Sequence, residues 1–484
     1  MASEIFATPP ADPGTRLSRS IALLAAVLLA GLLIFIQNSG AVKSLFEKGL
    51  TVEQQAELAE DILPPSAAEP FTLSARFAVQ AQSLPPAFAD DPIETMGAIE
   101  RFAVTPADRV RAAMVAGELL GDDEAISRLD RLDDSLPEGS ALHADVTDLL
   151  LLYTQGPGAL DEQTRDRLRA HHGFFGEVAM TRGLDDSHPD REPLVTGGGR
   201  LLAVILGIGL GLLLVFTVGF GLFITAIVLV GMKKIRSGMG DPEPGGSVFL
   251  EAFALFVAGF LLLQGGGVLL ARFVQDETWM MVITITAQWM LLATPLWPLL
   301  RGMRFNTFCR AIGWHSGKGV LREMGCGVLG YLAGLPLLIL GMGISIGLLA
   351  IVTTIRASMG LGDPPPPDNI VFDLASSNNP VILIAIFTLA AIWAPLCEES
   401  IFRGALYRHF RGRAGIVVST IGTALVFGSL HRYGPVLVFP VVMMGVTFAL
   451  MREWRGSLIA PVTAHAMHNA TVMILAFSIL RMIS

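Results

Sequence analysis

The segment PLCEESIFRGALYRHF, residues 395–410, places two adjacent carboxylates directly after a long apolar stretch. No charged side chain lies between Asp373 and Glu398. Ionisable side chains inside an apolar helix are costly, and they occur mainly where they face a partner or a polar cavity. We therefore expect the helix to continue past both acids to Arg408, so that Glu398 lies in a water-filled pocket within the membrane.

The composition of the whole chain is that of an integral membrane protein. Of its 484 residues 52% are hydrophobic and 16% are charged, and its mean hydropathy is +0.58, whereas soluble domains carry about a quarter charged residues. A helix that spans a bilayer needs about 20 mostly apolar residues. Nine segments qualify: 20–37, 200–232, 247–271, 279–300, 324–355, 380–407, 414–431, 435–451 and 457–481. The predicted fold class is an all-α, polytopic membrane helix bundle.

Residues 43–197 form an acidic insert between the first and second predicted spans. They hold 29 acidic and 13 basic side chains, a net of −16, while the rest of the chain carries +7. Thr105 followed by Pro106 is typical of a helix start, and Gly121 is typical of a helix end. Similar amphipathic stretches occupy 122–134, 141–154 and 159–172. We expect a soluble array of short helices.

The same insert suggests a docking role. Its net negative charge disfavours nucleic acid as a ligand and favours a protein partner for residues 43–197. His171 and His172 have no acidic residue at ligand spacing, so we expect a solvated surface there rather than a metal site.

The distribution of Lys and Arg predicts the orientation in the cell (plasma or inner) membrane. With the N-terminus in the cytoplasm, the inside segments carry sixteen basic residues and the short outside segments carry five, as the positive-inside rule requires. Residues 43–197 are then extracytoplasmic. We expect the first span, 20–37, to stay as an anchor. The alternative is a signal peptide cleaved near Ser39-Gly40-Ala41.

Three groups of polar residues interrupt the last apolar segments: Glu398, Glu399 and Arg403; His431; and His465, His468 and Asn469. Residues four apart share one helix face, so Arg403 is expected to hold Glu399 ionised. Glu398 is rotated by about 100° from Glu399 and can face a cavity. A carboxylate, imidazoles and an amide in one place could together activate water and stabilise an oxyanion.

These groups resemble a known signature. Glu398-Glu399-x-x-x-Arg403, Phe427-x-x-x-His431 and His465-x-x-x-Asn469 are similar to the three motifs of the CPBP intramembrane proteases, which include the CAAX prenyl endopeptidases and the bacterial Abi-type proteins. The resemblance covers about residues 380–481. Hydropathy and charge divide the rest of the chain, so four domains are expected: 1–42, a cytoplasmic tail and anchor; 43–197, the acidic extracytoplasmic helical domain; 198–379, four transmembrane helices with loops; and 380–484, the catalytic membrane core that the resemblance implies.

The resemblance also implies roles for the site residues. Glu398 and His431 would activate the attacking water, and His465 and Asn469 would hold the oxyanion. Glu399 and Arg403 would support the first helix. The family has also been described as metalloproteases, so Glu398, His431 and His465 are the ligands if a zinc site exists. HExxH spacing is absent, and we favour catalysis that needs no cofactor.

The predicted function is an intramembrane endopeptidase that acts on a membrane-associated protein or peptide in the lipid bilayer. The alternative is a non-catalytic scaffold or immunity-type protein that binds a partner through the acidic insert. A proton-coupled transporter is a third hypothesis, against which the sequence shows no inverted repeat. The sequence does not identify the substrate.

Overall fold

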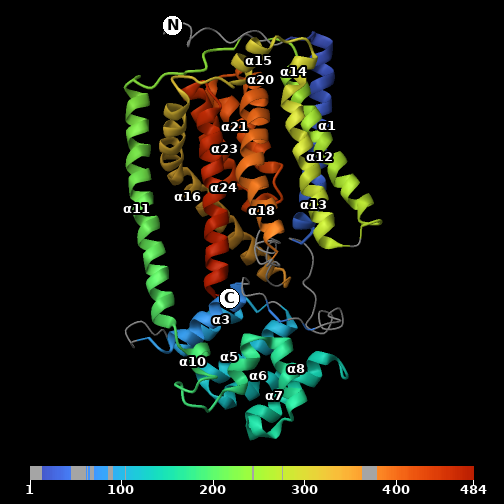
Figure 1. Cartoon of the computed structure of the whole chain (residues 1–484), viewed down its shortest axis with the longest axis vertical. Helices are drawn as coiled ribbons and strands as arrows, with labels where there is room; N and C mark the ends of the chain where they lie inside the picture. Colours follow the sequence, from blue (N-terminus) through green and yellow to red (C-terminus); the bar gives the residue numbers. More distant parts are fainter. Residues whose placement is uncertain are drawn as a thin grey trace. The chain divides into compact units, whose positions relative to one another are not determined.

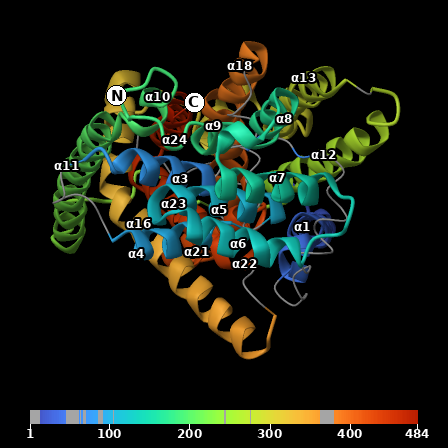
Figure 2. The same cartoon turned by 90° about the horizontal axis from the view of Figure 1, so that it is seen from below.

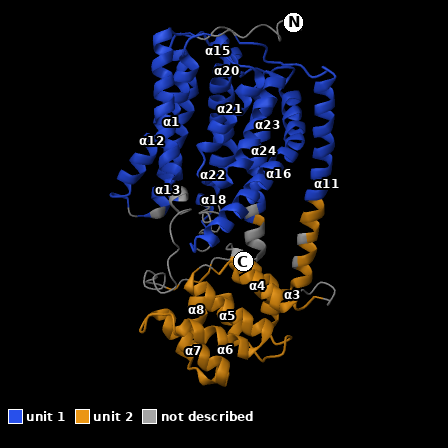
Figure 3. Cartoon of the chain, turned by 180° about the vertical axis from the view of Figure 1, so that it is seen from behind, with its two compact units in different colours: residues 1–47, 212–477 blue, residues 48–211, 478–484 orange. Residues whose placement is uncertain are grey.

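The computed structural model describes residues 13–44, 62, 64–65, 70–84, 91–103, 105–242, 245–274, 276–361 and 379–483. The regular secondary structure of these residues is helical with no strand, so the predicted all-α fold is confirmed for the described part of the chain. The chain divides into two compact units, coloured separately in Figure 3. Unit 1 comprises residues 1–47 and 212–477, and unit 2 comprises residues 48–211 and 478–484.

Unit 2 is built from the short helices that Figure 2 labels α3 to α10, several of which are also labelled in Figure 1. Their bounds are α3 (Pro70–Ala81), α4 (Pro92–Glu100), α5 (Pro106–Leu120), α6 (Asp122–Asp133), α7 (Ala141–Gln155), η3 (Pro157–Ala159), α8 (Glu162–His172), α9 (Phe174–Met180) and α10 (Glu192–Val195). The predicted start of α5 is confirmed, since Thr105 caps it and Asp108 completes a capping box. The predicted end at Gly121 is also confirmed.

The short helices of unit 2 enclose their own hydrophobic core. It includes Phe71, Val110, Leu149 and Phe175, each at most 2% exposed. Consecutive helices α5, α6 and α7 pack against one another. Burial of apolar area on this scale is the main stabilising term of a small domain, so the helical spacing seen in the sequence corresponds to a packed interior.

The prediction of a solvated surface at His171 and His172 is wrong for His172, which is fully buried. Asp145, on the preceding helix α7, accepts hydrogen bonds from His171 Nδ1 at 2.6 Å and from His172 Nε2 at 3.2 Å. The partner lies 26 residues before His171, too far along the chain for a local spacing rule to find. The pair is therefore part of the polar interior of unit 2.

Unit 1 contains the long apolar helices. Their bounds are α1 (Arg16–Ser44), α11 (Gly198–Gly231, which begins in unit 2), α12 (Val248–Leu270), α13 (Glu277–Gln288), η4 (Trp289–Leu296), α14 (Trp297–Leu300), α15 (Phe305–Ile312), α16 (Val320–Ser358), α18 (Pro380–Thr388), η5 (Leu389–Trp393), α19 (Ala394–Glu398), η6 (Glu399–Leu406), α20 (Tyr407–Arg411), α21 (Ile416–Ser429), α22 (Gly434–Leu437), α23 (Phe439–Arg455) and α24 (Ile459–Ile483). Among the described residues, six helices are long and apolar enough to cross a membrane. The chain is therefore a multi-pass membrane protein.

The six candidate spans match the first six predicted ones and cover Arg16–Gly40, Glu192–Gly231, Val248–Leu270, Thr278–Leu300, Val320–Ser358 and Pro380–Arg411. The last three predicted spans coincide with α21, α23 and α24. Helix α21 has only 14 residues, and the 17 residues of α23 include Arg452, Glu453 and Arg455. The count of nine spans and the orientation stay predictions.

Helix α1 packs along α12, as Figure 1 shows on the right. A stripe of small residues makes this close approach possible, because Ala22, Ala26 and Ala30 are buried in the same core cluster as Phe253 and Val257. Small residues at helix interfaces are typical of membrane bundles. The predicted cleavage site, Ser39-Gly40-Ala41, lies inside α1.

Candidate active site

The two acids of the opening segment lie on one continuous helix, Pro380–Arg411, which contains two π-helical segments, η5 and η6. Such segments are rare and occur often at functional sites. Pro395 explains part of this irregularity, because it has no backbone N–H and cannot donate a hydrogen bond to a carbonyl of the preceding turn. Ala390, in that turn, instead accepts a hydrogen bond from Asn469 Nδ2 at 2.8 Å.

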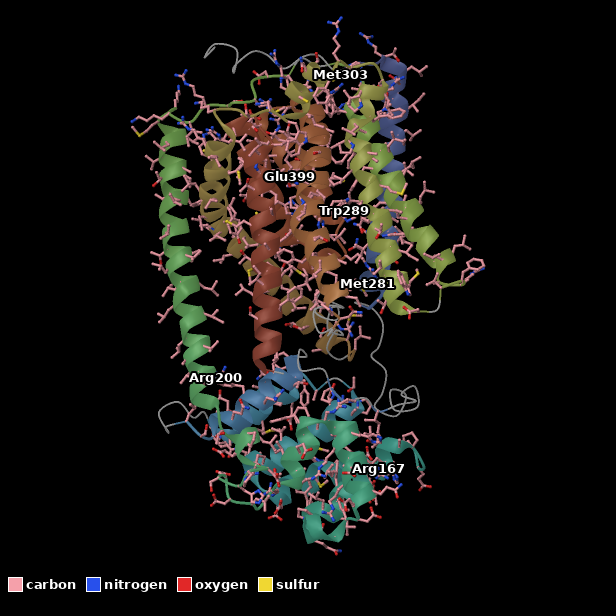
Figure 4. The ribbon with its side chains drawn as sticks, viewed as in Figure 1. Arg167, Arg200, Met281, Trp289, Met303 and Glu399 are labelled. Atoms are coloured by element: carbon pink, nitrogen blue, oxygen red, sulfur yellow. The ribbon has the colours of Figure 1, made fainter. Side chains whose placement is uncertain are left out.

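Glu399 is fully buried and connects its own segment, η6, to α24 (Figure 4, where it is labelled). Its Oε1 atom accepts a hydrogen bond from Arg403 Nη1 at 3.0 Å, so the predicted ion pair is present. The same oxygen accepts a hydrogen bond from His465 Nδ1 at 2.9 Å. Glu399 thus fixes the ring of His465 at Nδ1, the nitrogen that does not face Glu398. The sequence did not predict this contact.

Arg403 is held in an aromatic enclosure. Its guanidinium carbon lies 4.3 Å from the ring centre of Phe427 and 5.2 Å from that of Phe448, and Nη2 donates to the Gly445 carbonyl at 3.2 Å. Removing a cation from water is costly, so a buried cation needs an anionic partner and other favourable contacts. Contacts with the faces of aromatic rings supply part of this stabilisation. The enclosure therefore keeps Arg403 next to Glu399.

The bond to Glu399 also sets the tautomer of His465. A carboxylate oxygen only accepts hydrogen bonds, so Nδ1 of His465 carries the hydrogen, and when the ring is neutral Nε2 carries a lone pair. That Nε2 atom lies 4.0 Å from Oε2 of Glu398. Glu398 Oε2 is buried and makes no hydrogen bond to the described residues. One water molecule can hydrogen-bond to two acceptors at this separation.

His431 lies in the same region, but with different partners. Its Nδ1 donates to the Phe427 carbonyl at 2.7 Å, which leaves a lone pair on Nε2 here as well. The ring of Phe427 packs against both histidines, with centroids 4.7 Å from His431 and 6.2 Å from His465. Within the part of the chain that the structure describes, no hydrogen bond or ion pair joins His431 to Glu398.

Asn469 and His468 complete the predicted set. Asn469 uses one of its two amide hydrogens for Ala390, and an amide has a second one to offer. His468 is 3.4 Å from the hydroxyl of Tyr331, on a different side of α24 from His465. The structure thus brings Glu398, Glu399, Arg403 and His465 into direct contact or near contact, and it brings His431 to the same aromatic ring.

The arrangement does not fit a three-residue zinc centre. Among the described residues no group of three His, Cys, Asp or Glu side chains is placed to hold a metal ion, and a catalytic zinc site normally needs three protein ligands. Glu398 and His465 present two candidate atoms 4.0 Å apart. The third expected ligand, His431, packs against the Phe427 ring that also contacts His465, and among the described residues no hydrogen bond or ion pair joins it to Glu398.

Two positioning residues were missed from the sequence. Phe448 stacks on His465 with a centroid distance of 5.0 Å, and Gly445 accepts from Arg403. Both lie on α23, whose apolar sequence gives no sign that its residues pack against the polar groups. Only the alternation of small and large residues in GVTFAL hints at close packing, and this pattern is common in membrane helices.

Residues 380–471 match the model of a family described as Type II CAAX prenyl endopeptidase Rce1-like. The match covers the segment that carries all three motifs, so the resemblance predicted from those motifs is confirmed there. It supports a CAAX-type intramembrane protease in general terms. No curated protein and no solved structure matches the chain.

Proposed function

We propose that the protein is an intramembrane endopeptidase that hydrolyses a peptide bond in a membrane-associated protein or peptide. The observation that carries this proposal is the 4.0 Å separation between Glu398 Oε2 and His465 Nε2. Two proton acceptors face each other there inside an apolar bundle. Burying such groups costs free energy. A water held between them would satisfy both acceptors and would be placed for activation as a nucleophile.

The proposed reaction begins with that water. Its oxygen attacks the carbonyl carbon of the substrate, and Glu398 takes the proton that the water loses. The oxyanion accepts the remaining amide hydrogen of Asn469, which is fixed at its other hydrogen by Ala390. The carbon–nitrogen bond then breaks, and Glu398 returns the proton to the leaving amine. Base catalysis of this kind contributes about 10²–10⁴-fold in rate.

The tautomer of His465 changes its proposed role. The motifs assigned His465 to the oxyanion, which needs a hydrogen-bond donor. Because Nε2 carries a lone pair while Nδ1 donates to Glu399, the neutral ring instead orients the water. His431, whose Nδ1 donates to the Phe427 carbonyl, assists Glu398 by orienting the attacking water. Glu399 and Arg403 act as positioning residues through the ring of His465.

We also propose the cell membrane as the location, with the N-terminus in the cytoplasm and residues 43–197 outside. The excess of Lys and Arg in the segments assigned to the inside supports this orientation. A prenylated substrate requires a host cell that attaches prenyl groups to proteins.

The test compares new peptide ends in cells that produce the parent protein or Glu398→Gln. This change keeps the size of the side chain and removes the base, so we expect the parent's cleavage products to fall by about 10²-fold or more. Glu94→Gln is the matched control, since Glu94 is exposed on α4. If Glu398→Gln produced the same peptide ends as the parent, the proposal would be wrong.

A second arm tests the metal. The purified protein should cleave the identified peptide equally well after treatment with a chelator, since the arrangement does not fit three zinc ligands. Loss of cleavage that added zinc restores would contradict the metal-independent mechanism.

A further inference from the structure

A cavity of about 220 Å³ lies away from the proposed active site and has a strongly basic lining. Its charged residues are Lys234, Arg236, Lys318 and Arg455, against a single acid, Glu323. Clefts that hold drug-sized ligands measure about 300–1,000 Å³, so this one suits a small headgroup better than a peptide. The net positive charge favours an anionic ligand.

The one acid of the cavity is already neutralised. Glu323 is fully buried and accepts two hydrogen bonds from Arg455, at 2.8 and 2.6 Å. It also accepts from the backbone N–H of Lys318 at 3.0 Å. Gly317 permits this close turn, because a side chain there would come within 2.5 Å of the Glu323 carboxylate. The carboxylate therefore holds Arg455 and the backbone of Lys318 in place, and its charge is balanced by Arg455.

The loop that supplies Lys234 and Arg236 is also fixed. After α11 ends, the backbone N–H of Lys234 bonds to the Leu229 carbonyl at 2.9 Å. Four residues later the N–H of Gly238 donates to the carbonyl of Glu453 at 2.8 Å. The basic side chains thus stand on a loop tied to α11 at one end and to α23 at the other, and the cavity is a preorganised feature.

The position of the cavity identifies the source of the anion. Candidate spans end at Gly231 and begin at Val320, directly beside the lining residues Lys234 and Lys318. Trp454, which also lines the cavity, is half-buried, and the guanidinium of Arg455 lies 5.0 Å from its ring. Tryptophan and basic residues at helix ends are typical of the headgroup level of a bilayer, and basic pockets between spans on the cytoplasmic side bind anionic lipids.

We propose that this cavity binds the phosphate of an anionic phospholipid headgroup. The phosphate lies between Lys234, Arg236 and Lys318, while the ion pair of Glu323 and Arg455 forms the floor. The acyl chains extend along the apolar surfaces of α11 and α16, which are exposed in unit 1.

The test measures lipid binding to the purified full chain in detergent, by native mass spectrometry and by the shift in Tm. Phosphatidylglycerol should bind saturably and raise the Tm, and phosphatidylcholine should do so more weakly. In the variant Lys234→Ala/Lys318→Ala the affinity for phosphatidylglycerol should fall on the order of tenfold. The control Arg304→Ala/Arg310→Ala removes two exposed charges outside the cavity and should bind as the parent does.

Three results would overturn the proposal. The cavity variant, with an unchanged Tm before lipid is added, could bind phosphatidylglycerol as tightly as the parent. The control variant could lose as much affinity as the cavity variant, which would show a diffuse charge effect. Inorganic phosphate could raise the Tm as far as the lipid does and lose this effect in the cavity variant, which would assign the cavity to the soluble ion.

Discussion

The same arrangement of residues occurs in both units: a fully buried carboxylate accepts hydrogen bonds from an arginine and from histidine rings. In unit 1 Glu399 binds Arg403 and His465. In unit 2 Asp145 accepts hydrogen bonds from His171 and His172 as described above, and from Arg167 Nε at 3.0 Å. Figure 4 labels Arg167. The arrangement fixes a ring in one tautomer, and in unit 2 it also makes the fold sensitive to acid.

The acid sensitivity follows from two shifts of the same sign. Burial lowers the pKa of His172 below its ordinary value, against the opposing effect of Asp145. Burial opposes ionisation of Asp145, but the hydrogen bonds from both histidines outweigh it and leave its pKa lowered. In each case the unfolded state binds the proton more readily, so stability is present above the unfolded pKa and is lost as the pH falls.

We predict that α7 and α8 loosen as the pH falls below about 6.5, where unfolded histidine begins to charge. One titrating group changes the stability by at most about 1.4 kcal/mol per pH unit. His172→Gln retains a donor for Asp145 without the titration and should flatten this dependence. Hydrogen exchange of the full chain, corrected for the intrinsic effect of pH, measures it. An unchanged profile in His172→Gln, or a flattened one in the exposed control His188→Gln, would contradict the assignment.

At the scale of elements, the helix that carries Glu398 and Glu399 is positioned by close backbone contacts. A side chain at Gly404 in η6 would lie 2.4 Å from Ile312 Cγ1 and 3.0 Å from the Ile312 carbonyl. At Gly445 in α23 a side chain would lie 3.1 Å from Ala424 Cα. Protein interiors are packed densely and transmit such shifts, so these two glycines set how near η6 and α23 come to their neighbours.

We predict that Gly404→Ala destabilises unit 1 by about 1–3 kcal/mol, the usual cost of overpacking, and reduces cleavage because η6 moves away from His465. Gly347→Ala is the control, since nothing lies within 4 Å of a side chain added there in α16. Unfolding of the purified protein in increasing sodium dodecyl sulfate measures the stability. Equal midpoints for Gly404→Ala and the parent would show that the contact carries no strain.

At the scale of the molecule, the proposed site and the acidic helices belong to different units. Glu398, Glu399, Arg403, His431, His465 and Asn469 all lie in unit 1. Unit 2 has its own core and none of these residues. The proposed chemistry should therefore not require unit 2, and the docking role expected from its acidity stays a prediction.

We predict that replacing residues 62–197 by a Gly/Ser linker leaves cleavage of a short peptide within a few-fold of the parent. The scaffold hypothesis predicts the reverse, namely that this deletion abolishes the cellular function while Glu398→Gln has no effect. Peptide cleavage in detergent and the peptide ends found in cells separate the two. Loss of peptide cleavage by a folded deletion variant would contradict the assignment of the site to unit 1.

The features predicted from the sequence depend on neighbours along the chain. Hydropathy located the long helices, the Thr105 cap located α5, and the four-residue spacing found the pair of Glu399 and Arg403. The features that were missed depend on contacts between helices. The π-helical segment η5 includes Ala390, whose carbonyl accepts a hydrogen bond from Asn469 on another helix. The tautomer of His465 is set by its hydrogen bond to Glu399, 66 residues earlier. Such contacts have no local pattern, so only the folded structure shows them.

Asn38, near the end of the first long helix, has a consequence for how the protein is made. Its side chain donates to the Ser429 carbonyl at 3.3 Å and accepts the N–H of Gly434 at 3.0 Å, 396 residues later. These bonds brace the turn that carries His431. A ribosome must therefore finish nearly the whole chain before this brace can form. The turn that carries His431 therefore reaches its final position only late in synthesis, after the residues around Gly434 have left the ribosome.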